Sequence, residues 1–306
     1  MNSEQFPLLI VIAGPTAVGK TAFSIELAKE FKTPVISADS RQFYREMVIG
    51  TARPTVEEMD SVVHYFSGFL SVRDPYNVSR FEQDVLLKLD ELFRKHDRVI
   101  MTGGSGLYID AVCHGIDALP DPDLSIRSDL KDILKEKGIR ALQGMLKFHD
   151  PLYFEKVDTM NPGRLIRALE VSIMTGKPYS SFRKNQPAKR DFRILKIGLD
   201  LPREQLYSRI NERTDRMINT GLVEEARSLL PFRELNALRT VGYSELFQFF
   251  DGKCSLPEAI EKIKTNTRRY AKRQLTWFRR DPEIRWIDAG DSRSARPSDI
   301  VRSFLP

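Results

Sequence analysis

Gly14-Pro-Thr-Ala-Val-Gly-Lys-Thr21 is the stretch that decides the fold, because it matches G-x-x-x-x-G-K-[ST] at every fixed position. An apolar run of β type, residues 8–12, precedes it, and a helical pattern, residues 22–31, follows it. A strand, a glycine-rich turn and a helix in this order present backbone N–H groups and a positive helix end to a phosphate cluster. We therefore expect the whole loop to bind phosphate, through Gly14, Pro15, Thr16, Ala17, Val18, Gly19, Lys20 and Thr21. Lys20 adds a mobile charge, and the Thr21 hydroxyl can bind a phosphate-bound Mg²⁺.

The bulk properties are those of an ordinary globular protein of 306 residues, with 41% hydrophobic and 29% charged residues. This length predicts two domains, or one domain with an insertion. The apolar runs are too short for a transmembrane helix, and residues 1–7 lack the basic and apolar regions of a signal peptide. Cys113 and Cys254 are isolated and form neither a metal-type spacing nor a disulfide framework. We expect a cytoplasmic protein with no membrane contact, and nothing in the sequence indicates an obligatory protein partner.

Strand and helix patterns alternate in the first third of the chain, which predicts a parallel sheet flanked by helices. Further strands are expected at residues 34–38 and 98–101, and a capping box, Ser79-Arg-Phe-Glu82, predicts a helix from there to about Lys95. Residues 117–186 show helical patterns, notably at 126–137 and 162–175, with no convincing strand, and residues 192–200 return to strand character. The predicted fold is α/β, a P-loop NTPase-like parallel sheet with a helical insertion. Its core is expected at residues 1–117 and 190–306, and its insertion at 118–189.

The last third of the chain is expected to be mainly helical. Residues 204–230 form one long amphipathic stretch. A second capping box, Ser255-Leu-Pro-Glu258, predicts a helix that reaches about Phe278.

Asp39 follows the second expected strand, in Ser37-Ala-Asp-Ser-Arg-Gln42. At that edge of a P-loop sheet a carboxylate can accept a proton, hold Mg²⁺ through water, or only cap the next helix. Ser40, Arg41 and Gln42 can supply hydrogen bonds to a base or to a phosphate. Both a catalytic role and a capping role are compatible with this segment.

The third expected strand ends in Thr102-Gly-Gly-Ser-Gly-Leu-Tyr108 and carries no carboxylate. Many P-loop hydrolases place an acidic residue there to hold Mg²⁺. Glycines allow the backbone to approach a ligand closely, and Ser105 offers a hydroxyl, although the same glycines suit a turn needed only for packing. The missing carboxylate disfavours a motor or switch ATPase.

Arg209, Arg213 and Arg216 follow the i, i+4, i+7 spacing that places side chains on one helix face. A guanidinium group can donate two parallel hydrogen bonds to the oxygens of a phosphate, so this face suits a diphosphate. Pairing with Glu212 and Asp215 at the surface is the alternative, and the sequence does not decide between them.

A basic segment, residues 264–280, contains seven Lys or Arg residues and no acid, within a chain of net charge +6. Aromatic residues are interleaved with these charges, a combination that suits RNA. Arg269, Lys272 and Arg273 are its expected phosphate contacts, whereas a solvated helix face is the alternative, and Trp277 suits either stacking or the core. The scattered histidines are expected to form no ligand cluster: His64, His96, His114 and His149.

These motifs together resemble the tRNA dimethylallyltransferase family, and the resemblance is collinear over nearly the whole chain. The segments that carry it share their order and spacing with the family: Gly14–Thr21, Asp39-Ser-Arg-Gln-Phe-Tyr44, Ile49-Gly-Thr-Ala-Arg-Pro54, Gly103-Gly-Ser-Gly-Leu-Tyr108, Asn161-Pro-Gly-Arg-Leu-Ile-Arg-Ala-Leu-Glu-Val171, Gly176-Lys-Pro178, Met217 to Leu222, Gly242-Tyr243 and Thr267-Arg-Arg-Tyr-Ala-Lys-Arg-Gln-Leu-Thr-Trp-Phe278. Departures are mild: Ser105 stands where many members have Thr, Arg53 where Lys is common, and Val241 where Ile is frequent.

The resemblance implies transfer of a dimethylallyl group from dimethylallyl diphosphate to the adenosine 3′ to the anticodon of some tRNAs. It also implies Mg²⁺ as cofactor, Asp39 as general base, and a helical insertion that grips the anticodon arm. The implied tRNA contacts are Asp39, Ser40, Arg41, Gln42, Ser105, Arg127, Gly163, Arg164, Leu165, Ile166 and Arg167.

The chemistry of this reaction suits the residues independently of the resemblance. An exocyclic amine is a poor nucleophile, so the protein contributes most by stabilising charge on the leaving diphosphate. The P-loop amides, Lys20, a Mg²⁺ held partly by Thr21, and Arg213 are suited to that task, while Asp39 accepts the proton. Two rival functions remain: a small-molecule P-loop kinase, and an RNA-binding protein switched by a nucleotide. Neither explains Asp39 and the basic aromatic segment together.

Overall fold

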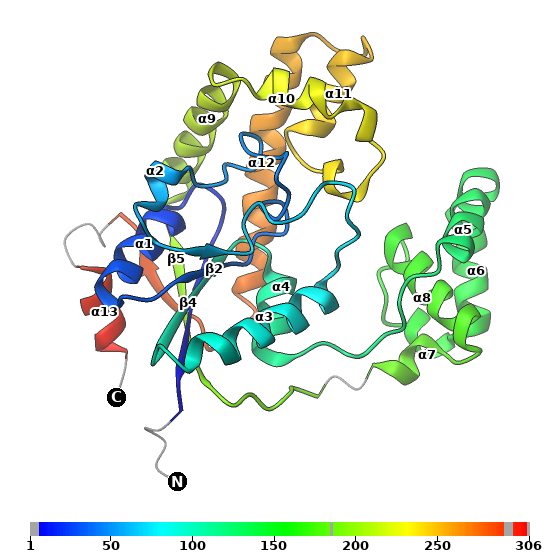
Figure 1. Ribbon diagram of the computed structural model, residues 1–306. Coiled ribbons are helices and arrows are strands. Elements are labelled where there is room, and N and C mark those ends of the chain that lie inside the picture. The colour runs from blue at the N-terminus through cyan, green and yellow to red at the C-terminus, as the bar shows by residue number, and fades with distance from the viewer. Residues whose placement is uncertain (1–5, 184–185, 291–295, 305–306) are drawn as a thin grey trace. The chain divides into compact units, whose positions relative to one another are not determined.

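The computed structural model describes residues 6–183, 186–290 and 296–304. Residues 1–5, on which most of the expectation about the N-terminus rests, lie outside these ranges. The contacts divide the chain into two compact units. The first comprises Met1–His114 and Lys189–Pro306, and the second comprises Gly115–Ala188 (Figure 1).

The first unit is built on a six-stranded sheet in the order β3-β2-β4-β1-β5-β6, and every pairing is parallel. Its strands are β1 (Leu8–Ala13), β2 (Val35–Ser37), β3 (His64–Tyr65), β4 (Arg98–Gly103), β5 (Arg193–Asp200) and β6 (Arg285–Asp288). The order confirms the predicted α/β fold. It also places the carboxyl ends of β2, β4 and β1 side by side, and the three polar segments of the sequence follow these strands.

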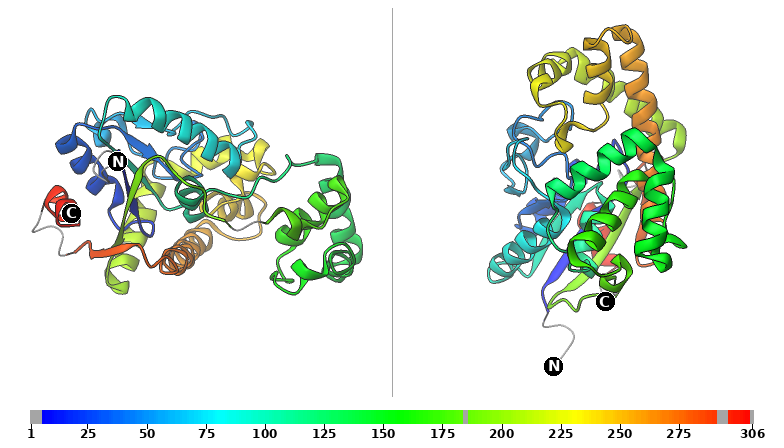
Figure 2. Two further views of the ribbon diagram at one scale, coloured as in Figure 1. Left: turned by 90° about the horizontal axis from the view of Figure 1, so that it is seen from below. Right: turned by 90° about the vertical axis from the view of Figure 1, so that its right-hand side faces the viewer.

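Alternate residues of β1 point to opposite faces of the sheet, as strand geometry requires. Leu9 and Val11 pack with one buried cluster, whereas Ile10 and Ile12 pack with another. The first cluster includes residues of α3 (Val78–Phe93), α4 (Gly106–His114), α10 (Leu222–Ser228), α11 (Tyr243–Phe250) and α12 (Leu256–Phe278). The second includes residues of α1 (Lys20–Phe31), α9 (Arg203–Asn219) and α13 (Pro297–Ser303). Helices therefore cover both faces, which Figure 2 shows from two further directions.

Two predicted helix boundaries differ from the structure. The box at Ser79–Glu82 is wrong as a helix start, because the Asn77 side chain already caps α3 by accepting the Arg80 N–H. The Ser255–Glu258 box is confirmed, with the serine hydroxyl and the glutamate carboxylate each bonded to the other's backbone N–H. The amphipathic stretch expected at residues 204–230 is divided into α9 and α10, and Gly221, at the N-cap of α10, adopts φ 105°.

Several short elements of the first unit are not predicted from the sequence. They are the edge strands β3 and β6, the helix α2 (Val56–Met59) and the 3₁₀ turns η3 (Leu230–Phe232) and η4 (Asn236–Leu238). None of them is long enough to show a clear hydrophobic period.

All the regular secondary structure in the described residues of the second unit is helical. Its elements are α5 (Leu124–Lys137), α6 (Ile139–His149), α7 (Pro151–Phe154), α8 (Pro162–Thr175) and η2 (Tyr179–Phe182). Helices α5, α6 and α8 pack against one another around a leucine-rich core that includes Leu130, Leu142 and Leu165. Buried Asp150 ties the unit together, because it caps α7 and accepts hydrogen bonds from the backbone and hydroxyl of Ser180.

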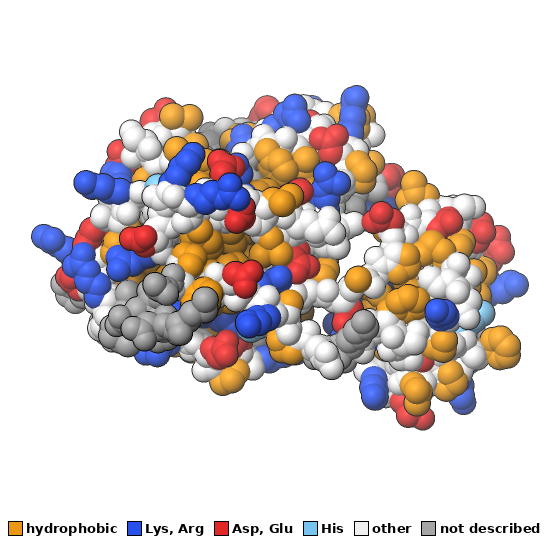
Figure 3. Space-filling view, turned by 60° about the horizontal axis from the view of Figure 1, so that its bottom comes forward, with side chains coloured by type: hydrophobic (Ala, Val, Ile, Leu, Met, Phe, Trp, Pro, Cys, Tyr) orange, Lys and Arg blue, Asp and Glu red, His pale blue; other side chains and the backbone are white. Residues whose placement is uncertain are grey.

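Among the described residues, no helix is long and apolar enough to cross a membrane. On the face drawn in Figure 3, basic and acidic side chains are interspersed among those shown in colour. The positive net charge of the chain is therefore not gathered into one continuous region of that face.

Candidate active site

The P-loop joins β1 to α1, and its backbone conformation requires glycine at two positions. Gly14 has φ 149°, and a Cβ there would lie 2.6 Å from the carbonyl oxygen of Leu199. Gly19 has φ 111° and occupies the N-cap of α1, where it provides no capping side chain. The first-turn N–H groups of α1 are consequently directed at the site without a side-chain acceptor from their own cap, as anion binding requires.

Lys20 lies over this loop and donates hydrogen bonds to the carbonyls of Gly14 (3.0 Å) and Pro15 (2.8 Å). Burial lowers the pKa of Lys20 to about 8; Asp39 opposes this effect and Arg213 adds to it. Burial also lowers the pKa of Arg213, although a guanidinium remains charged at neutral pH. Two cations and the positive end of α1 therefore lie close together. A bound anion would offset the repulsion between these positive charges.

The arginine face of α9 is directed at the P-loop. Arg209 donates to the carbonyl of Val18 (3.2 Å), and Arg213 lies 3.4 Å from the Thr16 hydroxyl. Arg216 lines a cavity of about 550 Å³ together with Lys20, Thr21 and the other two arginines. The alternative pairings are not formed, because Glu212 accepts from Ser208 and Asp215 pairs with Lys264.

Asp39 begins a tight turn directly after β2. Its carboxylate accepts the Arg41 N–H (3.1 Å), so it caps this turn and not an α-helix. Arg41 itself donates to the carbonyls of Asn236 and Ala237. The Ser105 hydroxyl, from the end of β4, accepts the Ser40 N–H (3.0 Å) and donates to the Ser40 hydroxyl (3.1 Å). The two segments that the sequence singled out are thus hydrogen-bonded to each other.

Helix α12 lies against the glycine turn after β4. Gln274 donates to the carbonyl of Gly104 (2.8 Å) and accepts the Thr16 N–H of the P-loop (2.9 Å). A Cβ at Gly104 would collide with Gln274, and one at Gly106 with the Trp277 indole. The glycines are therefore needed for close packing, and Trp277 is partly buried, donating to Asp110.

These elements surround one cavity of about 610 Å³. Its polar wall carries Thr16, Lys20, Thr21, Asp39, Gln42 and Arg213. Apolar side chains lie in the same wall: Ile210, Met217, Leu222, Val241 and Ile263. Helix α12 contributes Tyr270, Arg273 and Gln274. A molecule with an anionic head and a small apolar tail suits such a lining.

The basic side chains of α12 lie on different sides of the helix. Arg273 lines the 610 Å³ cavity, whereas Lys272 lines a second cavity with Asp200 and Arg279. Arg269 is exposed and donates to Asn266. Only part of the expected tRNA-contacting set therefore lies beside Asp39.

The remaining predicted tRNA contacts belong to the helical unit. Arg127 and Arg167 each donate to one oxygen of Glu170 at 2.7 Å, and Glu170 is fully buried. Leu165 is fully buried and Ile166 is 8% exposed, so these two residues belong to the core of the unit near the start of α8. Gly163 and Arg164 are exposed in its first turn.

His114 lies beside Asp281 and Glu283, with one nitrogen or oxygen atom of each within 4.8 Å of the others. The Lys196 ammonium occupies the centre of this group, 2.7 Å from His114 and Asp281 and 2.8 Å from Glu283. Burial alone would lower the pKa of Lys196, but its bonds to both carboxylates raise it. The group is thus a charged lysine with its partners.

Two further residues line the cavity, and a third supports its wall; the sequence did not identify any of the three. Gln274 connects the P-loop, the glycine turn and α12. Burial and the nearby charge of Asp39 raise the pKa of Tyr270 to about 12, so its phenol is protonated at neutral pH. Glu225 binds a loop of the cavity wall, as described below. Only tertiary contacts identify them, although Gln274 and Tyr270 lie within a motif that the sequence displays.

The fold and the site define a P-loop protein whose phosphate-binding end opens into a partly apolar cavity. The sequence profile of the IPP transferase family matches residues 42–281. The chain is 54% identical to a tRNA dimethylallyltransferase of Christiangramia forsetii, over 97% of this chain and 98% of that one. It is 51% identical to tRNA dimethylallyltransferase 1 of Bacteroides thetaiotaomicron, with 92% and 91% covered. The chain belongs to the IPP transferase family.

Solved structures agree with this assignment. The chain resembles the full-length tRNA isopentenylpyrophosphate transferase of Bacillus halodurans with a TM-score of 0.68 and 37% identity, covering 92% of this chain and 90% of that one. It also resembles a eukaryotic dimethylallyltransferase described as acting on tRNA, with a TM-score of 0.78 and 26% identity, covering 96% of this chain and 77% of that one.

Proposed function

We propose that this protein transfers a dimethylallyl group from dimethylallyl diphosphate to the exocyclic amine of the adenosine 3′ to the anticodon in a subset of tRNAs. One observation carries the proposal: a single cavity is lined by the phosphate-binding Lys20, Thr21 and Arg213, by the carboxylate of Asp39, and by apolar side chains. The family to which the chain belongs supports the same reaction.

The diphosphate is the leaving group in this proposal. Its oxygens bind the P-loop amides, Lys20 and Arg213. Negative charge develops on these oxygens as the allylic C–O bond breaks, and the fixed donors stabilise it. Hard oxygen donors suit Mg²⁺, and Thr21 offers such a donor beside the phosphate position, so Thr21 with the diphosphate would hold the ion. The bound ion would supply further neutralisation of the leaving group.

Asp39 acts on the acceptor. The adenine leaves its stack to reach the cavity, as in other enzymes that modify bases. Asp39 binds the exocyclic amine, and the new N–C bond forms as the amine proton passes to the carboxylate. Ser105 and Gln42 hold the acceptor side, and no covalent intermediate with the protein is needed.

The anticodon arm contacts Arg273 and Arg269 of α12, where phosphate-binding charge lies near the cavity. In the helical unit, the exposed first turn of α8, with Gly163 and Arg164, provides a second contact. Arg127 and Arg167, both bonded to buried Glu170, present their remaining N–H groups to the arm.

The proposal is tested by incubating the protein and Mg²⁺ with unmodified tRNA and radiolabelled dimethylallyl diphosphate, and separately with tRNA and labelled ATP. Label from the prenyl donor should enter tRNA at a single adenosine. If it never does, the proposal is wrong, and phosphoryl transfer from ATP would favour a kinase.

A further inference from the structure

The loop 48–52 forms part of the cavity wall but has no regular secondary structure to hold it. Gly50, Thr51 and Ala52 line the cavity. Ala52 adopts a positive φ of 45°, a conformation that a non-glycine residue takes only when its surroundings impose it. The position of this loop therefore depends on contacts with other segments.

Glu225 provides the densest of these contacts. One carboxylate oxygen accepts the N–H groups of Val48 (2.9 Å) and Ile49 (2.8 Å), and the other accepts that of Gly50 (2.9 Å). The second oxygen also accepts the Tyr243 hydroxyl at 2.6 Å. A carboxylate with four converging donors fixes three consecutive peptide groups, which a neutral side chain cannot do equally well.

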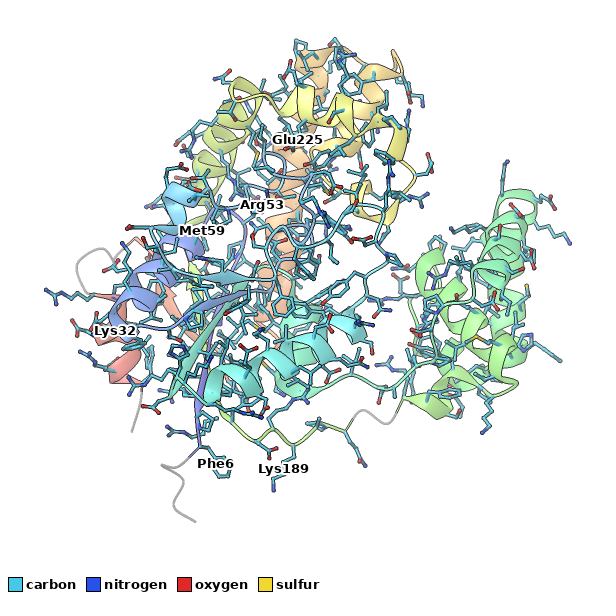
Figure 4. All side chains as sticks on the ribbon, in the orientation of Figure 1. Phe6, Lys32, Arg53, Met59, Lys189 and Glu225 are labelled. Atoms are coloured by element: carbon cyan, nitrogen blue, oxygen red, sulfur yellow. The ribbon has the colours of Figure 1, made fainter. Side chains whose placement is uncertain are left out.

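Tyr243 contacts both Glu225 and the loop. Its side chain is fully buried, and a Cβ at Gly50 would lie 2.6 Å from its ring. At the far end of the loop, Arg53 donates to the carbonyl of Tyr44 (3.1 Å). Figure 4 labels Glu225 and Arg53, the two side chains that hold the loop at its ends.

The carbonyls that this arrangement presents orient two groups of the proposed site. The Gln42 amide donates to the carbonyls of Thr51 and Ala52, each at 3.2 Å. Arg213 lies 3.5 Å from the carbonyl of Thr51. A shift of the loop would therefore move the donors on both the acceptor side and the diphosphate side of the cavity.

We propose that Glu225 is a positioning residue of the prenyl transfer: it fixes the loop 48–52 and thereby sets the Gln42 amide and the Arg213 guanidinium. This inference rests on the proposed function. Glu225 does not line the 610 Å³ cavity or the 550 Å³ cavity, both of which P-loop residues line. It therefore acts through the loop 48–52 and does not contact the substrate.

The test compares Glu225→Gln with Glu224→Gln, an exposed neighbour on the same helix. The glutamine amide retains the shape of the glutamate side chain. Its NH₂ group, however, would face hydrogen-bond donors and cannot accept from them. Glu225→Gln should lower kcat by roughly 10- to 100-fold, the usual effect of a misplaced reacting group, and leave the KM for tRNA within about threefold. The dissociation constant of inorganic diphosphate, measured by calorimetry, should rise roughly tenfold through Arg213. Tyr243→Phe, which removes one donor and keeps the ring, should give a smaller loss of the same kind.

Two results would overturn the inference. In one, Glu225→Gln behaves as Glu224→Gln does in both kcat and diphosphate affinity. In the other, the activity of Glu225→Gln falls only as far as the fraction of folded, binding-competent protein falls. The stoichiometry of diphosphate binding and the melting curve measure that fraction. Such a result would indicate a purely structural role. Failure of the proposed function itself is distinct, because the unaltered protein would then transfer no label, while diphosphate titration would still compare the variants.

Discussion

Asp39 is the side chain on which the proposed chemistry depends most directly. Asp39→Asn retains an oxygen for the Arg41 N–H but removes the base. We expect kcat to fall about 10²- to 10⁴-fold, the usual contribution of a general base, with the KM for tRNA within about threefold. Single-turnover kinetics with labelled donor measure the first quantity, and filter binding of tRNA the second. Equal losses in both would make Asp39 a binding residue only.

Lys20 should make diphosphate binding depend on pH. Because its pKa is lowered to about 8, its ammonium is charged below that pH and loses its proton as the pH rises further. Affinity for inorganic diphosphate should therefore fall between about pH 7 and pH 9, even though diphosphate itself becomes more anionic. Lys20→Arg keeps its charge over the whole range and serves as the control. Parallel pH profiles of the two proteins would contradict the assignment.

Sequence patterns identify residues that belong to a local motif or to a regular helical spacing. Lys20 and Thr21 follow from a contiguous motif, and Asp39 from its position after a strand. Glu225 and Gln274 do not, because their bonds span 175 and 258 residues of sequence. A single sequence contains no signal for such pairs.

At the scale of elements, the contact between α12 and the start of α4 leaves no room for a side chain on Gly106. Gly106→Ala would push its methyl group into the Trp277 indole, which Asp110 holds in place. We expect a loss of about 1–3 kcal/mol in the free energy of unfolding, the usual cost of overpacking. Chemical denaturation measures it.

Gly144→Ala is the matched control for that substitution. Gly144 lies within α6, and a Cβ there meets nothing within 4 Å. Because alanine favours a helix more than glycine does, the helical unit should gain roughly 0.5–1 kcal/mol. If both substitutions destabilise equally, the steric argument for Gly106 is wrong.

Element boundaries were predictable where the local chemistry is self-contained. The Ser255–Glu258 box closes on itself, so the start of α12 was predicted correctly. The Ser79–Glu82 box failed because Asn77 competes two residues earlier, and Glu82 bonds Arg190 instead. The strands β3 and β6 exist because longer neighbours provide hydrogen-bonding edges, which no local pattern reveals.

For the whole molecule, the affinity for tRNA should depend steeply on salt. Each phosphate contact releases condensed counterions, so the logarithm of affinity falls linearly with the logarithm of salt concentration. Arg273→Ala should reduce that slope by about one, whereas Lys29→Ala, on α1 and outside the proposed footprint, should not. Filter binding between about 50 and 200 mM salt measures both. A flat response of the unaltered protein would exclude α12 from the footprint.

The position of β1 in the sheet has a consequence for how the chain acquires its structure. β1 lies between β4 and β5, and β5 is synthesised only after the entire helical unit. One edge of the strand that precedes the P-loop is therefore unpaired during much of translation, whereas the helical unit makes mostly local contacts and folds quickly. The phosphate-binding loop is thus among the first segments made and among the last completed, an order that amide exchange on ribosome-bound chains of increasing length can follow.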